Sequence, residues 1–405
     1  MERDLAVVLD PTGRDIHAEA ARIRAQGPVA PIELPGGVLA WSVTGYDAAR
    51  RVLADERFSK DPRAHWTAYA NGEIGPEFPL IAWARMENMT TSHGEAHSRQ
   101  RRLVLTAFTP RRVETMRAGI EKLVAELLDG LGVPVPGATV DLKMGFAHPL
   151  ASRVIGDLIG IPAEARTAIL GDGYAAGGAA KSPAEAAAAF ALVREGVLAL
   201  IADKRRSPGD DLATDLIAAQ DEGSRMTDLE IASTILLLLN TGTEPAMNLI
   251  LNATAALLTH PAQRELIRTR QVTWSDAIEE TLRVQAPVAH LPFRFAVNDV
   301  EIEGVTIRRG DPVLVHFAGV GRDPAAHGED ADAFDVTRAD KKHLSFGHGV
   351  YRCIGSSLAW LETELALDAL FRRFPGLALA ADPAELAPQG TFIMNGYAAL
   401  PVRLA

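Results

Sequence analysis

The chain has 405 residues, of which 47% are hydrophobic and 23% charged, and this composition excludes a disordered or fibrous protein. Its formal net charge of −11 argues against nucleic acid or an anionic membrane as the main partner. The single cysteine excludes an internal disulfide framework, and the acidic start of the chain does not resemble a signal peptide or anchor, so we expect a cytoplasmic protein.

The first hundred residues mix short strand-like pieces, such as residues 37–43, with short helical ones. Residues 112–258 are mainly helical in pattern, with apolar residues at helical spacing in 113–131 and 231–258. Between these two stretches, residues 171–189 are rich in Gly and Ala. Their composition fits either a surface loop that leads into a helix or a lid over a pocket.

After residue 283 the pattern changes. Residues 300–308 alternate around a glycine and predict a hairpin, and residues 311–316 predict a further strand. A helix is predicted over 349–373, and the last thirty residues have the pattern of β structure. The sequence therefore predicts a mainly α fold with small β-sheets, in one domain that spans residues 1–405.

The segment 346–359, FGHGVYRCIGSSLA, places three glycines around Cys353, directly before a predicted helix. Glycine permits tight turns and the close approach of a flat cofactor to the backbone. The start of a helix offers free N–H groups and a positive dipole, both of which stabilise a thiolate. A buried, inert cysteine in a Gly-rich turn is the alternative, but the spacing as a whole favours a metal-binding thiolate.

This segment resembles the cysteine loop of the cytochromes P450, Phe-Gly-x-Gly-x-(His/Arg)-x-Cys-x-Gly, with Phe346, Gly347, Gly349, Cys353 and Gly355 on its fixed positions. The resemblance covers nearly the whole chain and is nearest to actinomycete enzymes that oxidise natural products and steroids. It implies a cytochrome P450 fold and haem b, whose iron takes Cys353 as its axial thiolate ligand. The haem would be buried between the cysteine loop and a long oxygen-side helix.

Tyr351 departs from the family pattern, because the family usually has a basic residue there that contacts a haem propionate. A tyrosine hydroxyl can still donate a hydrogen bond, so Tyr351 stays among the predicted cofactor-binding residues. His97 and Arg101, one helical turn apart, resemble the family's His-x-x-x-Arg, and Arg294 matches another propionate-binding arginine. Anionic propionates inside a protein need such charge-assisted partners.

Glu280 and Arg283 match the family's Glu-x-x-Arg motif. At a spacing of three residues the two side chains share one face of a helix. By itself the match predicts no more than an exposed ion pair. The resemblance implies instead a buried pair that supports the cysteine loop.

Residues 241–246, TGTEPA, lie in a predicted helix where the family usually has (Ala/Gly)-Gly-x-(Asp/Glu)-Thr-(Thr/Ser). Gly242 and Glu244 match, but Pro245 replaces the alcohol that normally works with the acid to organise a proton-donating water. Proline lacks an N–H, so it frees the carbonyl of Thr241 and should bend the helix. That carbonyl, or the hydroxyls of Thr241 and Thr243, could hold a water in place of the lost alcohol. A kink without catalytic meaning is the alternative.

The resemblance places the substrate pocket between the segments 63–89, 171–189, 287–291 and 391–394. The first segment is rich in aromatic residues and Met, which can stack an aromatic guest, although such residues can also be plain core. The predicted pocket residues are His65, Trp66, Trp83, Met86, Val288, Ala289 and Ile393.

The sequence is compatible with two kinds of reaction on a bulky small-molecule substrate. The replacement at Pro245 and the aromatic wall slightly favour oxidative C–C or C–N coupling of an indole or other aromatic substrate, such as a tryptophan-containing cyclic dipeptide. The subgroup supports hydroxylation of a polyketide, macrolide or steroid. The alternative outside enzyme chemistry is a haem protein without catalytic activity. The resemblance implies a monooxygenase that uses O2 and NAD(P)H through a ferredoxin and ferredoxin reductase, and we expect a monomer.

Overall fold

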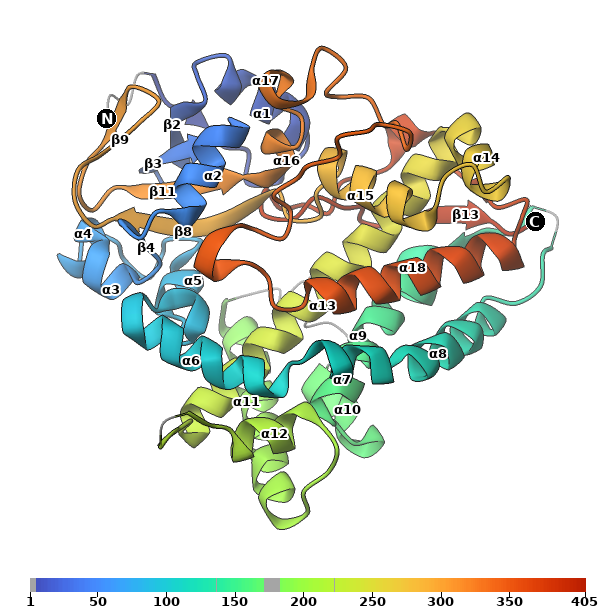
Figure 1. The fold of residues 1–405 in the computed structure, drawn as a ribbon, viewed down its shortest axis with the longest axis horizontal. Helices are drawn as coiled ribbons and strands as arrows, with labels where there is room; N and C mark the ends of the chain where they lie inside the picture. The colour runs from blue at the N-terminus through green and yellow to red at the C-terminus, as the bar shows by residue number, and fades with distance from the viewer. Residues whose placement is uncertain (1–4, 136, 171–182, 222) are drawn as a thin grey trace.

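A computed structural model describes residues 5–135, 137–170, 183–221 and 223–405. Helices make up most of the molecule, and the largest sheet lies toward one end (Figure 1). The described α-helices are α1 (Ile16–Arg24), α2 (Tyr46–Ala54), α3 (Pro62–His65), α4 (Thr67–Ala70), α5 (Ile81–Arg85), α6 (Gly94–Ala107), α7 (Pro110–Thr115), α8 (Arg117–Gly130), α9 (His148–Ile159), α10 (Ala163–Leu170), α11 (Pro183–Arg206), α12 (Leu212–Ala218), α13 (Asp228–Thr259), α14 (Pro261–Arg268), α15 (Trp274–Val284), α16 (Phe317–Val320), α17 (Pro324–His327) and α18 (Ser356–Arg373).

The largest sheet has six strands in the order β1-β2-β3-β11-β8-β4, and it joins the start of the chain to a segment near residue 300. In its centre β11 runs parallel to β3 and antiparallel to β8. Three smaller sheets pair β9 with β10, β6 with β7, and β12 and β5 with β13. The strands are β1 (Val7–Val8), β2 (Val29–Leu34), β3 (Val38–Val43), β4 (Phe58–Ser59), β5 (Val140–Asp141), β6 (Gln220–Asp221), β7 (Ser224–Arg225), β8 (His290–Ala296), β9 (Val300–Ile302), β10 (Val305–Ile307), β11 (Pro312–His316), β12 (Ala378–Leu379) and β13 (Pro401–Arg403).

The mainly helical class, the hairpin at residues 300–308 and the strand at 311–316 are confirmed. Two boundaries were wrong. The helix expected over 349–373 begins at Ser356, because residues 349–351 form a separate 3-10 turn that carries the cysteine loop. In the last thirty residues the β structure is short and interrupted: the strands β12 and β13, isolated bridges at Pro388, Met394 and Tyr397, and a 3-10 turn at Pro383–Glu385.

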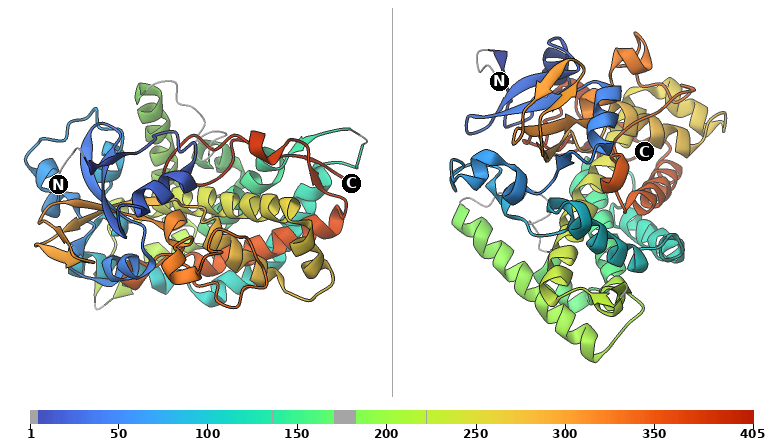
Figure 2. Two further views of the ribbon diagram at one scale, coloured as in Figure 1. Left: turned by 90° about the horizontal axis from the view of Figure 1, so that it is seen from above. Right: turned by 60° about the vertical axis from the view of Figure 1, so that its left-hand side comes forward.

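Helix α13 runs through the centre of the molecule and packs against α9, α11 and α18 (Figures 1 and 2). Its start is fixed by a capping box, in which the Thr227 hydroxyl accepts the Glu230 N–H and the Glu230 carboxylate accepts the Thr227 N–H. The helix continues through Pro245 without interruption. No helix in the described parts of the chain is both long enough and apolar enough to cross a membrane.

Glu280 and Arg283 form a fully buried ion pair on α15. The Arg283 guanidinium donates to both carboxylate oxygens of Glu280, at 2.6 and 2.8 Å. Its remaining N–H groups bond to the backbone carbonyls of Gly321, Ala331 and Ala333. The pair therefore fixes the path of the irregular segment that leads to the cysteine loop.

Removing the charge of Glu280 tests how much this pair stabilises the protein. Glu280→Gln should lower stability by about 3–5 kcal/mol, because it leaves the Arg283 charge buried without a counter-charge. The matched control is Glu265→Gln, which breaks an exposed i,i+3 pair with Arg268 on the neighbouring helix α14 and should cost under about 1 kcal/mol. Melting temperature and haem content per chain check the prediction, and equal losses in the two variants would contradict it.

Candidate functional site

Two glycines allow the tight turns of the cysteine loop. Gly347 and Gly349 have φ values of 72° and 71°, which side chains other than glycine rarely adopt. A Cβ on Gly349 would also lie 2.7 Å from the carbonyl oxygen of Leu53 in α2. The loop closes with a hydrogen bond of 2.8 Å from the Cys353 N–H to the carbonyl of Phe346. These contacts place the sulfur just before the start of α18.

The thiol of Cys353 is surrounded by protein on most sides but remains open on one. Burial raises its pKa above that of an ordinary cysteine, whereas the bond to the Gly355 backbone and the nearby charges of Arg101 and Arg352 lower it. The residue is nevertheless exposed, and Gly355 is the N-cap of α18. An open sulfur with N–H and guanidinium groups behind it fits a thiolate metal ligand.

Next to this loop lies a cluster of cations and rings centred on Tyr351, which we call the Tyr351 cluster: Lys60, His97, Arg294 and Tyr351. The ring of His97 lies 4.0 Å from that of Tyr351, and the Arg294 guanidinium carbon lies 5.1 Å from the Tyr351 ring centre. Burial lowers the pKa of Arg294 to about 10, and burial followed by the neighbouring charge of Arg101 lowers that of His97 to about 4.

The structure thus brings together the residues predicted to hold the propionates. Arg101, one turn after His97 on α6, donates to the carbonyl of Arg352 at 2.7 Å and so lies beside the cysteine loop. Arg294 reaches the same place from β8. Neither Arg294 nor Lys60 has a carboxylate within 4 Å among the described residues. Buried cations without a counter-charge fit a group that carries two carboxylates, as haem does.

Tyr351 takes part in this cluster differently from the expectation. Its hydroxyl donates to the backbone carbonyl of Ser92 at 2.7 Å, so its proton is already used. Burial raises the pKa of Tyr351 to about 12, which keeps the group neutral. What Tyr351 presents to the cations is the face of its ring. No sequence motif points to Lys60, and only the fold brings this lysine beside Tyr351.

Only part of the 241–246 segment lies on an open face of α13. Thr241 is exposed, and Pro245 follows it one turn later on the same side. The Thr241 hydroxyl donates to the Leu237 carbonyl at 2.8 Å, which leaves its oxygen free to accept. Thr243 is 1% exposed and donates to the Leu239 carbonyl, so of the two hydroxyls only that of Thr241 is placed to hold a water.

Gly242 and Glu244 serve other faces of the helix. A Cβ on Gly242 would lie 2.8 Å from Cδ1 of Ile155, so this glycine lets α13 pack closely against α9. The Glu244 carboxylate accepts a hydrogen bond from Gln389 and lies near Lys143. Burial raises its pKa, while Lys143 and Gln389 lower it. The acid is therefore held by groups behind the open face.

Trp66 was predicted on the pocket wall, but the structure places it in the core of the sheet. It is 1% exposed and packs against Phe293 and Phe295, with ring centres 5.3 Å away in both cases. Ala289 is also fully buried, and its N–H bonds to the carbonyl of Ile393. Both residues therefore shape the protein beneath the predicted wall and are not surfaces of it.

The other predicted wall residues are half-buried: Trp83, Met86, Val288, Ile393 and His65. Val288 forms an antiparallel bridge with Met394, which brings the segments 287–291 and 391–394 side by side. His65 packs edge-on against His93, 5.7 Å between ring centres. The predicted lid at 171–189 lies outside the described residues for its positions 171–182.

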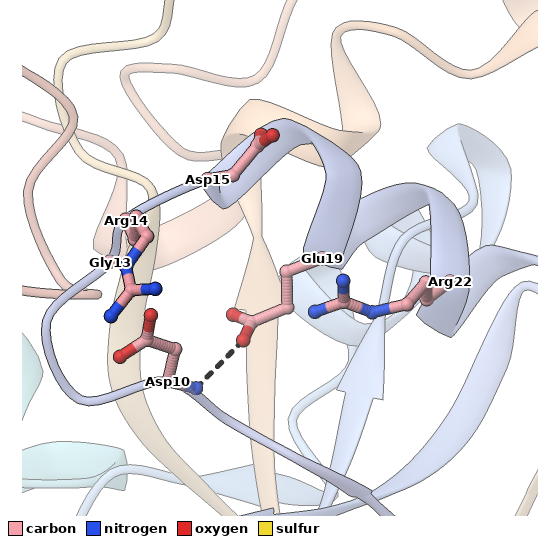
Figure 3. A pocket seen from close by; sticks show the side chains of 6 residues that line it. All are labelled: Asp10, Gly13, Arg14, Asp15, Glu19 and Arg22. Atoms are coloured by element: carbon pink, nitrogen blue, oxygen red, sulfur yellow. Dashed lines mark hydrogen bonds between the residues drawn. The ribbon is translucent and has the colours of Figure 1, made fainter.

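Other polar groups gather away from this site. Figure 3 shows a small cleft at the start of α1, where the Asp10 N–H donates to Glu19 at 2.8 Å. Glu19 also approaches the buried rings of His290 and His316. The Gly319 N–H donates to Nδ1 of His316, which puts that ring's proton on Nε2 and makes it a donor. With one ring nitrogen accepting from Gly319 and the other protonated, His316 in this tautomer offers no free lone pair to a metal ion.

Replacing the cysteine tests the ligand. The reduced wild-type protein with carbon monoxide should show the absorption band of thiolate-ligated haem, and Cys353→Ser should lose it because a hydroxyl does not supply the thiolate. Ser357→Ala, at an exposed position in the first turn of α18, is the control and should keep the band. A band that survives in Cys353→Ser would show that the ligand lies elsewhere.

Comparisons with known proteins agree with this geometry. The family model for Cytochrome P450 matches residues 195–384. The chain is 48% identical over 396 residues to 2-hydroxy-5-methyl-1-naphthoate 7-hydroxylase of Streptomyces carzinostaticus, which covers 98% of this chain and 97% of that one. It is 39% identical over 401 residues to 6-deoxyerythronolide B hydroxylase of Saccharopolyspora erythraea, with 96% of each chain covered.

A solved structure, CYP154A1 from Streptomyces coelicolor A3(2), is 44% identical and superposes with a TM-score of 0.90. The match covers 99% of this chain and 100% of that one. Such coverage includes both the cysteine loop and α13. This chain therefore belongs to the cytochrome P450 family, and it is a haem-thiolate monooxygenase in which the only cysteine, Cys353, is the iron ligand.

Proposed function

We propose that this monooxygenase hydroxylates an aromatic, polyketide-type natural product. The observation that carries the proposal is the 48% identity, over almost the full length of both chains, with an enzyme named for hydroxylating a naphthoate. The relative from Saccharopolyspora erythraea is also named as a hydroxylase. The slight preference for coupling that the sequence suggested has no such support among these relatives.

The haem, when bound, supplies the oxygen activation, and the residues of this chain position the substrate and move protons. Pro245 has no N–H, so the Thr241 carbonyl has no helical donor and is free to accept a hydrogen bond. Together with the Thr241 hydroxyl oxygen, it gives two acceptors for one water on the open face of α13. We propose that this water, and not an alcohol at position 245, relays protons.

The predicted walls suit a flat, bulky guest. Val288 and Ile393 are branched aliphatic side chains of moderate size on two segments that the Val288–Met394 bridge holds together. Trp83 and Met86, from the segment 63–89, offer an aromatic ring and a flexible thioether. For the electrons we propose a ferredoxin and its NAD(P)H-dependent reductase.

Oxidative coupling remains the second candidate, and Pro245 is the residue that favours it. In coupling, two hydrogen atoms leave the substrates and both atoms of O2 leave as water, so protons must still be delivered; a polar group of the substrate could supply this delivery in place of the missing alcohol. The two chemistries differ in product mass, which makes them easy to separate.

Binding and product analysis test the proposal directly. With 2-hydroxy-5-methyl-1-naphthoate as probe, we expect a shift of the Soret band on binding and a product heavier by one oxygen atom. A tryptophan-containing cyclic dipeptide serves as the comparison. If the dipeptide alone gives the spectral shift and a product that has lost two hydrogens, coupling is the function and hydroxylation is wrong.

Two substitutions at Pro245 test the proton relay. Pro245→Ala restores the helical N–H, and Pro245→Thr restores both the N–H and the alcohol. If a water at Thr241 already relays protons, Pro245→Thr should raise coupled turnover by far less than the about 100-fold that a general acid contributes. It should also exceed Pro245→Ala only slightly, measured as product and hydrogen peroxide per NADPH. A large gain specific to Pro245→Thr, with unchanged product, would show that the relay is simply defective.

A further inference from the structure

Lys60 is a buried lysine whose charge no described residue neutralises. It follows strand β4 directly, is 6% exposed, and places Nζ 5.8 Å from the centre of the Tyr351 ring. Burial, and then the positive charge of Arg294, lower the pKa of Lys60 to about 7. Lysine is almost never fully buried unless it is paired, so this position calls for an anion.

The groups around Lys60 do not supply one. Arg294 comes from β8 and His97 from α6, and both add positive charge or a neutral ring to the Tyr351 cluster. Asp61, the next residue in the chain, turns its carboxylate to the N–H groups of Arg63. The Tyr351 hydroxyl donates to Ser92 and stays protonated.

The cysteine loop also lacks the basic residue that the family usually has at position 351. Position 351 carries a tyrosine, and Arg352, the next residue, accepts a hydrogen bond from Arg101 through its carbonyl while its side chain is exposed. The Tyr351 ring lies against His97 on one part of its surface and receives Arg294 and Lys60 near its face. The neutral ring of Tyr351 therefore occupies the position where the family usually has a basic residue, and Lys60 lies beside that ring.

We propose that Lys60 binds a haem propionate and supplies the positive charge that Tyr351 does not. The flat tyrosine ring positions the lysine stem, and the ammonium group joins Arg294, His97 and Arg101 around the two carboxylates. The inference rests on the haem that the family implies and is independent of the substrate proposed above. It adds a contact from the residue after β4, at the edge of the six-stranded sheet, to a cofactor otherwise held by α6, β8 and the cysteine loop.

The test uses purified holoenzyme and two readouts that do not depend on turnover. Lys60→Met keeps the length and packing of the side chain but removes its charge. We expect haem transfer to apomyoglobin to become about tenfold faster, because a charge-assisted hydrogen bond is lost. The reduction potential should become more negative, since a nearby cation stabilises the reduced haem. Lys60→Arg should behave like the wild type in both measurements.

Two further variants separate charge from packing. Lys204→Met removes a lysine that pairs with Asp211 at the end of α11, and it should change neither readout. Adding Tyr351→Arg to Lys60→Met returns a cation to the cysteine loop and should restore slow haem transfer and the potential. If Lys60→Met yields too little folded protein, Lys60→Gln and the double variant answer the same question.

The proposal is overturned if Lys60→Met, or Lys60→Gln in its place, releases haem at the wild-type rate and keeps the wild-type potential. It is also overturned if Lys60→Arg loses haem as fast as Lys60→Met, because this would show a role in shape alone. Unchanged product with the true substrate would leave the hydroxylation proposal intact in either case.

Discussion

A thiolate must be kept inside a protein whose interior disfavours charge, and the neighbourhood of Cys353 is organised around that requirement. Burial raises the pKa of the thiol, while the Gly355 backbone, Arg101 and Arg352 act in the opposite direction. These groups can reach the sulfur only because the loop turns tightly at Gly347 and Gly349. These opposing effects on the pKa suit a site in which a bound iron ion would supply the further positive charge that keeps the sulfur deprotonated.

The Tyr351 cluster is a second place in the site where charge is buried. Residues from α6, β8, the cysteine loop and the segment after β4 meet there, although they lie far apart in the sequence. The buried charges of Lys60 and Arg294 repel one another, and among the described residues no carboxylate lies within 4 Å of either. The six-stranded sheet and the helices therefore meet at a point where the described residues leave positive charge unbalanced.

Local motifs made much of this site predictable. Cys353, the Glu280–Arg283 pair and the His97–Arg101 pair were each recognised from residues a few positions apart, and the structure places them as described. Trp66 was misplaced because its burial depends on Phe293 and Phe295, which reach it only through the pairing of β8 within the sheet. Lys60 could not be predicted for a similar reason, because the contact that singles it out is with Tyr351, almost 300 residues away in the sequence. Contacts across the fold leave no periodic trace in the sequence.

Arg283 recognises the segment before the cysteine loop only through backbone carbonyls, at residues 321, 331 and 333. Carbonyl groups are the same in every residue, so these three bonds to Arg283 do not depend on which side chains the segment carries at those positions. Side chains still anchor the segment elsewhere, since Phe334 and Val336 are buried in the core. Substitutions of exposed side chains on this segment should therefore leave the three bonds, and with them the approach to the cysteine loop, in place.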